Sequence, residues 1–404
     1  MSNSLRWRLG AFMFLHYAAG GAWMPIFALY LQRDLALSVG QIAFLFALMP
    51  VARMGAPLVG GQLADRHFHL QRLLGVLYLL CGGLLYLMSR GGSFGLFCVW
   101  VFLMSAVGSQ LDALSTTLAF RHLPDPERNF GPIRVWGTIG WIVPGWALTA
   151  WRLWHGVHGG ADAFLFAAGL CAALALFTLA LPSSPPSKSG IPWAFLGAFR
   201  LLRNRNFLVF MGLAFVASSQ MQYFAQISAP YLVRIGVSAA NLPAVLTISQ
   251  VSEIVAMAWL LPRALPRLGI RNCLLIGAAA WPVRCLIYSL GQPLALVLGS
   301  LALTGVSFTF FTIVGQVYIN RMAGADIQAS AQSLLILVSS GLGSFLGAFL
   351  AGAVQAHFSV GQGAAQAVDY SRVFVVPAAV LLAGVAVFWA LFREVKEGYG
   401  AAAA

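Results

Sequence analysis

The chain has 404 residues, of which 60% are hydrophobic and 9% charged, and its mean hydropathy is +0.83. Soluble domains carry about 25% charged residues, so this composition excludes an ordinary soluble domain and indicates an integral membrane protein. The net charge of +13 does not indicate a nucleic-acid-binding surface, because the basic residues are scattered singly or in small groups between apolar runs.

Twelve apolar runs follow one another along the chain, each close to the length of about 20 residues that a helix needs to cross a bilayer. Six come first: Leu9 to Leu31, Ile42 to Leu63, Leu73 to Met88, Phe94 to Phe120, Pro132 to Trp151 and Ala163 to Leu181. Six follow a polar connection: Phe207 to Leu232, Asn241 to Leu261, Cys273 to Leu290, Pro293 to Asn320, Ala329 to Val354 and Val373 to Phe392. We therefore predict an all-α integral membrane protein with twelve transmembrane helices in two six-helix bundles.

The polar connection spans residues 182–206. It begins with a Pro/Ser-rich stretch, and apolar residues at helical spacing between Trp193 and Leu202 then lie beside arginines, which favours an amphipathic helix on the membrane surface. We predict an N-terminal bundle over residues 1–181 and a C-terminal bundle over residues 207–404. Two bundles joined in this way favour alternating access around a site at the bilayer midplane.

The basic residues predict the orientation. With Met1 in the cytoplasm, sixteen of the 24 fall in inner loops and tails and five in outer loops, while Arg53, Arg134 and Arg284 lie within runs. The positive-inside rule then predicts a multi-pass protein of the cytoplasmic (inner) membrane with both termini in the cytoplasm. No cleavable signal peptide is apparent, because the first run is 23 residues long and no small-residue cleavage site follows it.

The cysteines do not indicate a disulfide or a metal site. Their count is odd, no CxxC pair occurs, and all five lie in or at the ends of apolar runs: Cys81, Cys98, Cys171, Cys273 and Cys285. We expect no metal and no cofactor. The chain also has no apparent nucleophile–base pair or phosphate-binding loop, so we do not expect an enzyme.

Two acidic residues lie inside predicted membrane spans. Glu253 is the only charge in the run from Asn241 to Leu261, and Asp112 lies in the fourth run. An ionisable side chain at mid-span costs roughly 2.5 kcal/mol or more, so it usually faces an internal cavity and has a function. Alternating exposure would let such a carboxylate load and release a proton. We expect Glu253 to couple transport to protons, with Asp112 as the rival carrier.

A permanent ion pair is the alternative role for these acids. An ion pair of Arg53 with Asp112 would lie within the first bundle, and an ion pair of Arg284 with Glu253 would lie within the second. His16 lies on the first run beside two glycines, where it could relay protons, bind substrate or serve only in helix packing.

The loop between the second and third runs carries a motif. Residues 61–66 read GQLADR and Arg72 follows, which resembles the loop signature of the major facilitator superfamily. Asp65 could cap a neighbouring helix end, and Arg66 and Arg72 could bridge helices at the cytoplasmic surface, which would form a conformational latch. Ordinary positive-inside residues are the alternative interpretation.

A more specific motif opens the fifth run. Residues 130–141 read FGPIRVWGTIGW, and together with SQVSE at residues 249–253 they resemble the nucleoside:proton symporter family within that superfamily. Residues 269–272, 280–284 and 329–332 agree, so the similarity covers most of the chain.

The resemblance implies a substrate site. The positions that match nucleoside contacts in the family are Arg134, Thr138, Trp141, Gln222, Gln250, Glu253 and Phe308. A nucleoside needs donors and acceptors for its hydroxyls and base edge and an aromatic ring to stack on the base, and these side chains supply both. From the residues alone, Arg134 could instead anchor the helix at the inner surface, and the two glutamines could join helices by hydrogen bonds.

Two positions depart from the family pattern. Thr309, kept here as a candidate substrate contact, stands where the family carries an acidic residue, and Ala225 stands where it carries an amide. Loss of both removes strong acceptors for sugar hydroxyls. The alternative is therefore a symporter for another small polar or aromatic solute, such as a sugar or an aromatic acid.

The function that these features favour is proton-coupled uptake of nucleosides by alternating access. A non-transporting membrane sensor of the same fold is the other class, but it would have no need to keep Glu253, Gln250 and Arg134 in the bilayer. The expected partners are a small solute, protons and the lipid bilayer, without nucleic acid, and we expect a monomer.

Overall fold

The computed structural model describes residues 3–66, 69–123, 126–156, 159–185, 200–322, 328–360 and 367–393, and most of these residues are helical. The first half contains α1 (Asn3–Trp23), η1 (Met24–Ile26), α2 (Phe27–Arg33), α3 (Val39–Arg66), α4 (Leu70–Ser89), α5 (Phe94–His122), α6 (Pro126–His155), α7 (Ala161–Phe177) and η2 (Thr178–Ala180). The second half contains α8 (Arg205–Arg234), α9 (Leu242–Leu246), α10 (Ile248–Val255), η4 (Ala256–Leu260), α11 (Leu261–Leu290), α12 (Leu294–Ser300), α13 (Ala302–Ser307), η5 (Phe308–Ile313), α14 (Val314–Met322), α15 (Gln328–Ile336), η6 (Leu337–Gly343), α16 (Ser344–His357) and α17 (Tyr370–Leu391). The short strands β1 (Ser359–Val360) and β2 (Ala367–Val368) pair antiparallel.

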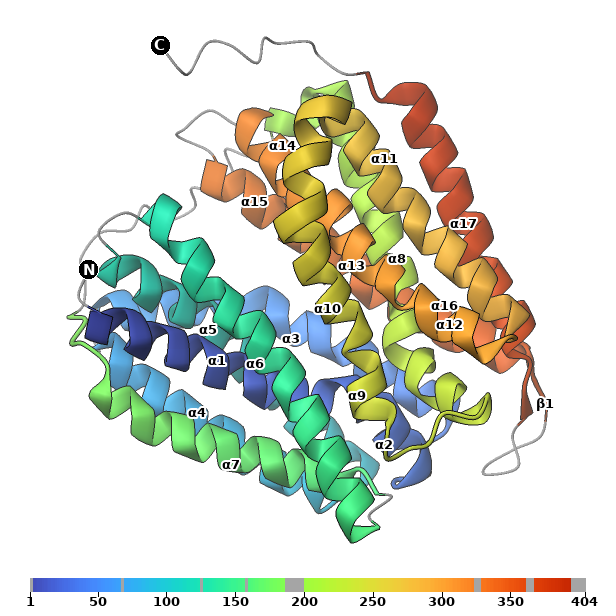
Figure 1. The fold of residues 1–404 in the computed structure, drawn as a ribbon. Coiled ribbons are helices and arrows are strands. Elements are labelled where there is room, and N and C mark those ends of the chain that lie inside the picture. Colours follow the sequence, from blue (N-terminus) through green and yellow to red (C-terminus); the bar gives the residue numbers. More distant parts are fainter. Residues whose placement is uncertain are drawn as a thin grey trace, which may run out of the picture.

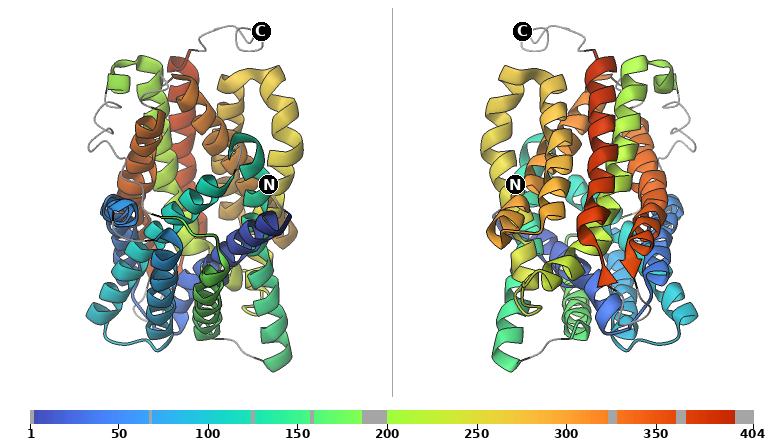
Figure 2. Two further views of the ribbon diagram at one scale, coloured as in Figure 1. Left: turned by 90° about the vertical axis from the view of Figure 1, so that its left-hand side faces the viewer. Right: turned by 90° about the vertical axis from the view of Figure 1, so that its right-hand side faces the viewer.

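The helices form two bundles, one from each half of the chain. In the first, α1 packs against α6 and α7, α4 against α5 and α7, and α3 against α5. In the second, α11 packs against α17 and α13, and α8 against α16 and α17. Figure 1 shows the first bundle, from blue to green, beside the second, from yellow to red, and Figure 2 shows the same arrangement from two sides. The predicted fold class, an all-α membrane protein of two helical bundles, is confirmed.

Nine helical segments of the described chain are long and apolar enough to cross a membrane, and Val39–Met54 is a shorter apolar helix. One of the nine, Leu242–Leu290, is interrupted at Gly269, whose φ of 74° and ψ of 172° are not helical, so it covers two predicted runs. The predicted run from Pro132 to Trp151 lies in α6. The predicted runs therefore fall on helices, while their count as twelve membrane crossings stays a prediction.

Two glycines bring helices close together beside residues of the candidate site. A methyl group at Gly21 of α1 would lie 2.5 Å from the carbonyl oxygen of Trp141 on α6. A methyl group at Gly305 of α13 would meet the backbone nitrogen of Glu253 on α10. Glycine, which has no Cβ, allows the helix backbones to approach this closely, as small residues commonly do between membrane helices. These contacts fix α1 beside α6 and α13 beside α10.

Three segments of the second half, η4, η5 and η6, are π-helical. Such turns interrupt the regular hydrogen-bond pattern of a helix and are frequent at functional sites. The segment η5 includes both Phe308 and Thr309.

The two halves are joined by hydrogen bonds at the end of the bundle remote from the chain termini. The indole nitrogen of Trp146 donates to Thr247 Oγ1 over 3.0 Å, and the backbone nitrogen of Ala244 donates to Thr149 Oγ1 over 3.1 Å. Arg152 Nη1 also donates to the carbonyl of Ala239, over 3.4 Å. The C-terminal part of α6 is thus bound to α9 and to the residues around it (Figure 1).

The polar connection between the halves is anchored to the first bundle. His122 Nε2 lies 2.6 Å from Ser184 Oγ, and Arg121 Nη1 donates to the carbonyl of Pro185 over 3.1 Å. Most of the predicted amphipathic helix falls in residues 186–199, which lie outside the described residues.

Candidate functional site

A cavity of about 380 Å³ lies between the two halves. The first half contributes apolar residues and one tryptophan to its wall: Gly21, Met24, Pro25, Phe27, Phe46, Met49 and Trp141. The second half contributes most of the polar groups, among them Ser228, Thr247, Ser249, Gln250, Arg284 and Thr304. A mainly apolar cavity with a few convergent polar groups has the character of a small-molecule site.

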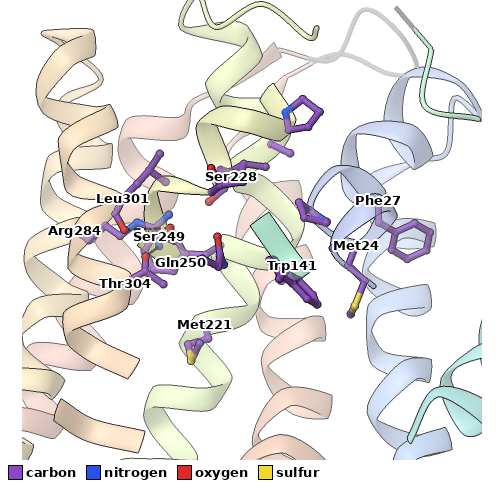
Figure 3. Close-up of a pocket in the computed structure, with 18 of the residues that line it drawn as sticks. Met24, Phe27, Trp141, Met221, Ser228, Ser249, Gln250, Arg284, Leu301 and Thr304 are labelled. Carbon is purple, nitrogen blue, oxygen red and sulfur yellow. Dashed lines mark hydrogen bonds between the residues drawn. The ribbon is translucent and has the colours of Figure 1, made fainter. Parts of the chain in front are cut away.

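Trp141 and Gln250 both line this cavity, one from each half of the chain (Figure 3). Trp141 is on α6, and Gln250 is on α10 in the other half of the chain. Gln250 is half-buried, and its side-chain amide has no hydrogen-bond partner among the described residues. The cavity wall therefore combines a flat aromatic ring with a free amide, which can both donate and accept hydrogen bonds.

Arg284 is held by several side chains in the cavity wall. Its side chain is 4% exposed, Nη1 donates to Thr304 Oγ1 over 2.5 Å, and Nη2 donates to Tyr288 Oη over 2.9 Å. The guanidinium carbon lies 4.0 Å from the centroid of the Phe224 ring, in a cation–π contact. Its Nε has no hydrogen-bond partner in the described chain. The ion pair with Glu253 that the sequence suggested is absent from the described residues, because hydroxyls and an aromatic face hold the guanidinium instead.

Arg134 lies near both intramembrane acids. Its guanidinium carbon is 4.1 Å from the centroid of the Tyr17 ring, and it is close enough to Glu253 and Asp112 to attract their carboxylates. Glu253 is half-buried, and its side-chain carboxylate makes no hydrogen bond or ion pair within the described chain. It follows Gln250 by three residues on α10, so the two side chains lie on adjoining parts of one helix face. Thr138 is half-buried one turn after Arg134.

A second cavity of about 380 Å³ lies inside the first bundle. Its wall includes His16, Arg53, Tyr78 and Asp112, and it shares Trp141, Met24 and Met49 with the cavity between the halves. Asp112 Oδ1 is 3.2 Å from His16 Nε2, so its ion-pair partner is His16 rather than Arg53. Among the described residues no cluster of three or more His, Cys, Asp or Glu side chains could hold a metal ion.

Several predicted site residues do not line either cavity. Gln222 is half-buried and is not in the wall of the first cavity. Its neighbour Met221 is in that wall, and so is Ala225, which departs from the family pattern. Phe308 is half-buried, and Thr309 is fully buried, with no hydrogen-bond partner for its Oγ1 among the described residues. The roles of Gln222, Phe308 and Thr309 in binding therefore stay predictions, as do those of Arg134, Thr138 and Glu253.

The predicted latch falls largely outside the described side chains. Helix α3 extends to Arg66, but the side chains of Asp65 and Arg66 are outside the described part of the chain. Arg72 is exposed in the first turns of α4. The latch stays a prediction.

Sequence reasoning missed some residues in the cavity wall. Trp281 and Arg284 carry part of the family resemblance, yet neither was assigned to the site. Their spacing of three residues places them on one helix face, and a charged residue at mid-run was a usable signal. Thr304 and Ser228 gave no such signal, since single hydroxyl residues are common in membrane helices.

Known proteins resemble this chain over nearly its whole length. The putative nucleoside transporter YegT of Escherichia coli (strain K12) is 31% identical over 360 residues, which are 85% of this chain and 83% of that protein. The xanthosine permease of the same organism is 27% identical over 379 residues, 88% of this chain and 89% of that protein. A crystal structure of the nucleoside transporter NupG superposes with a TM-score of 0.85 at 23% identity, covering 97% of this chain and 100% of that one, and supports the fold.

The sequence profile of one family matches residues 1–397, and its description is "Nucleoside H+ symporter". The match spans both bundles and every segment that lines the two cavities. The chain therefore belongs to the nucleoside H+ symporter family.

Proposed function

We propose that this protein carries nucleosides into the cell together with protons by alternating access between its two bundles. The observation that carries the proposal is the cavity between the halves, whose wall contains Trp141 from the first half and Gln250 from the second. An aromatic ring can stack on a base, while the amide and the hydroxyls can pair with a base edge or with ribose. The family membership supports the substrate class and the coupling ion.

The positive-inside pattern supports placing both termini in the cytoplasm. In that orientation the hydrogen bonds of Trp146, Thr149 and Arg152 to the second half lie at the outer end of the bundle. The described conformation is then closed to the outside. The proton enters with the nucleoside from outside, the bundles rock, and release inside follows deprotonation of Glu253.

Ala225 and Thr309 favour a test that includes other solutes. Ala225 is in the cavity wall, where a methyl group replaces the amide of the family pattern. The deciding experiment measures uptake of labelled uridine and adenosine by cells without their own nucleoside transporters, with and without a protonophore. Uptake that collapses with the protonophore supports the proposal. Absence of uptake by a protein confirmed in the membrane contradicts it, and directs the search to sugars and aromatic acids or to a sensor.

The Glu253→Gln variant tests the carboxylate in the same cells. Glutamine keeps the size of the side chain but cannot carry a proton. We expect proton-driven accumulation to fall while exchange of labelled for unlabelled nucleoside persists. Full uphill accumulation in this variant would sink the assignment of Glu253.

A further inference from the structure

We infer that His16 and Asp112 form a proton-binding site in the first bundle, separate from Glu253, so that each half of the transporter carries one proton. The inference rests on the proposed function and adds to it a residue pair and a proton count. The side chain of His16 is 7% exposed and that of Asp112 is 54% exposed, with 3.2 Å between His16 Nε2 and Asp112 Oδ1. A buried imidazole thus meets a carboxylate that opens to the cavity.

Both ring nitrogens of His16 have partners. Nε2 faces Asp112, and Nδ1 lies 2.9 Å from the hydroxyl of Tyr78, which in turn lies 3.0 Å from Ser115 Oγ. Tyr78 and Ser115 are both buried. The four side chains form one hydrogen-bonded row across helices α1, α4 and α5.

This row can gain a proton without losing a hydrogen bond. In the unloaded form, His16 holds one proton on Nε2, which it donates to Asp112, and Nδ1 accepts from the Tyr78 hydroxyl. In the loaded form, His16 holds a proton on each nitrogen, Nδ1 donates to Tyr78 Oη, and the Tyr78 hydroxyl turns to donate to Ser115 Oγ. Hydroxyl groups allow this reversal because they both donate and accept. The His16–Asp112 pair thereby passes from one negative charge to neutral.

The exposed end of the pair lies in a cavity that adjoins the cavity between the halves. Asp112 lines the second cavity, and this cavity shares Trp141, Met24 and Met49 with the cavity between the halves. A change in the position of Trp141 therefore alters both cavities together.

Arg134 connects the His16–Asp112 pair with Glu253. The His16 ring packs edge-on against the Tyr17 ring, with 4.7 Å between the two centroids. The guanidinium of Arg134 lies over the same Tyr17 ring. Arg134 attracts both Asp112 and Glu253, so neutralising the His16–Asp112 pair strengthens its relative attraction to Glu253. The other titratable or charged groups around the pair are Arg53 on α3, Cys81 on α4 and Cys171 on α7.

The test measures accumulation of a neutral nucleoside by the purified full-length transporter in vesicles, with a pH gradient of one unit and the membrane potential held at zero. Each coupled proton supports about tenfold accumulation, since one pH unit is a factor of ten. We expect about 100-fold for the wild type and about tenfold for His16→Gln and for Asp112→Asn. The double variant His16→Gln/Glu253→Gln should only equilibrate the nucleoside. His155→Gln, an exposed histidine of α6, is the matched control and should behave as the wild type.

Exchange of labelled nucleoside at equal pH shows that each variant is folded and binds substrate. If His16→Gln disrupts the fold, Asp112→Asn at the exposed end of the pair decides alone. A wild-type accumulation ratio in Asp112→Asn overturns the inference. A wild type that neither accumulates nor exchanges any nucleoside contradicts the proposed function instead.

Discussion

Arg152 and Asp162 form a two-point ion pair between α6 and the first turn of α7. Arg152 Nε donates to Asp162 Oδ2 over 2.7 Å, and Nη2 donates to Oδ1 over 2.6 Å. The arginine is 2% exposed, and its remaining Nη1 reaches the carbonyl of Ala239 in the second half. The pair therefore positions the arginine that joins the two bundles at the end remote from the termini.

Arg152→Gln should destabilise the protein strongly. Removing one partner of a buried ion pair leaves the other charge uncompensated, which costs about 3 kcal/mol or more in free energy of unfolding. Arg372→Gln is the matched control, because Arg372 is 72% exposed in its 3.3 Å pair with Asp369. Such exposed ion pairs contribute about 0–1 kcal/mol to the free energy of unfolding. Thermal unfolding of both variants in detergent checks this, and equal loss in the two would contradict the assigned role of Arg152.

Trp141→Ala should weaken nucleoside binding. Stacking of a base on an aromatic side chain contributes about 1–3 kcal/mol, so the Kd should rise roughly 5- to 150-fold. Trp141→Phe keeps a ring and should lose much less. The control is Trp154→Ala on the same helix, whose side chain is 87% exposed. Calorimetric titration with uridine gives the Kd values, and an unchanged Kd for Trp141→Ala would exclude stacking on this ring.

Ala225→Asn should tighten nucleoside binding. Ala225 lines the cavity, so an amide there can pair with a sugar hydroxyl. A net hydrogen bond contributes about 1 kcal/mol, which corresponds to a roughly fivefold lower Kd. Ala225→Leu, which adds volume without a polar group, is the control. If both variants weaken binding alike, the side chain at position 225 does not contact the polar groups of the substrate, and the prediction is wrong.

The contact between His122 and Ser184 should weaken in acid. Burial lowers the pKa of His122 below 6.5, and the neighbouring Arg121 lowers it further. The folded state therefore favours the neutral imidazole, so the docking of the connection is complete above pH 6.5 and is lost as pH falls through 6.5 to the lowered pKa. The protection factors of the Ser183 and Ser184 amides, that is, their exchange rates relative to the intrinsic rate at each pH, should fall between pH 7.5 and pH 5. His122→Gln should remove this dependence, and a pH-dependent change that survives in it must come from another group.

The sequence by itself determined the class of fold and the family. Apolar runs of bilayer length are a local property of the chain, because a helix in lipid must satisfy its own backbone hydrogen bonds. The motif at residues 130–141 and the segment ending at Glu253 carried the family resemblance. Each is contiguous in the sequence, so it can be recognised without the tertiary structure. The isolated charges of Asp112 and Glu253 also predicted that these side chains face the interior of the two halves rather than lipid.

Only the tertiary structure decided which polar groups meet. His16 rather than Arg53 lies beside Asp112, and Arg284 meets Thr304 and Tyr288 rather than Glu253. Such pairings depend on how each helix is rotated about its axis, and a helix that is apolar nearly all round does not specify that rotation in its hydropathy. Packing specifies it instead, through close contacts such as Gly21 against Trp141. The position of Trp141 between the two cavities follows from those contacts and could not be predicted from the sequence.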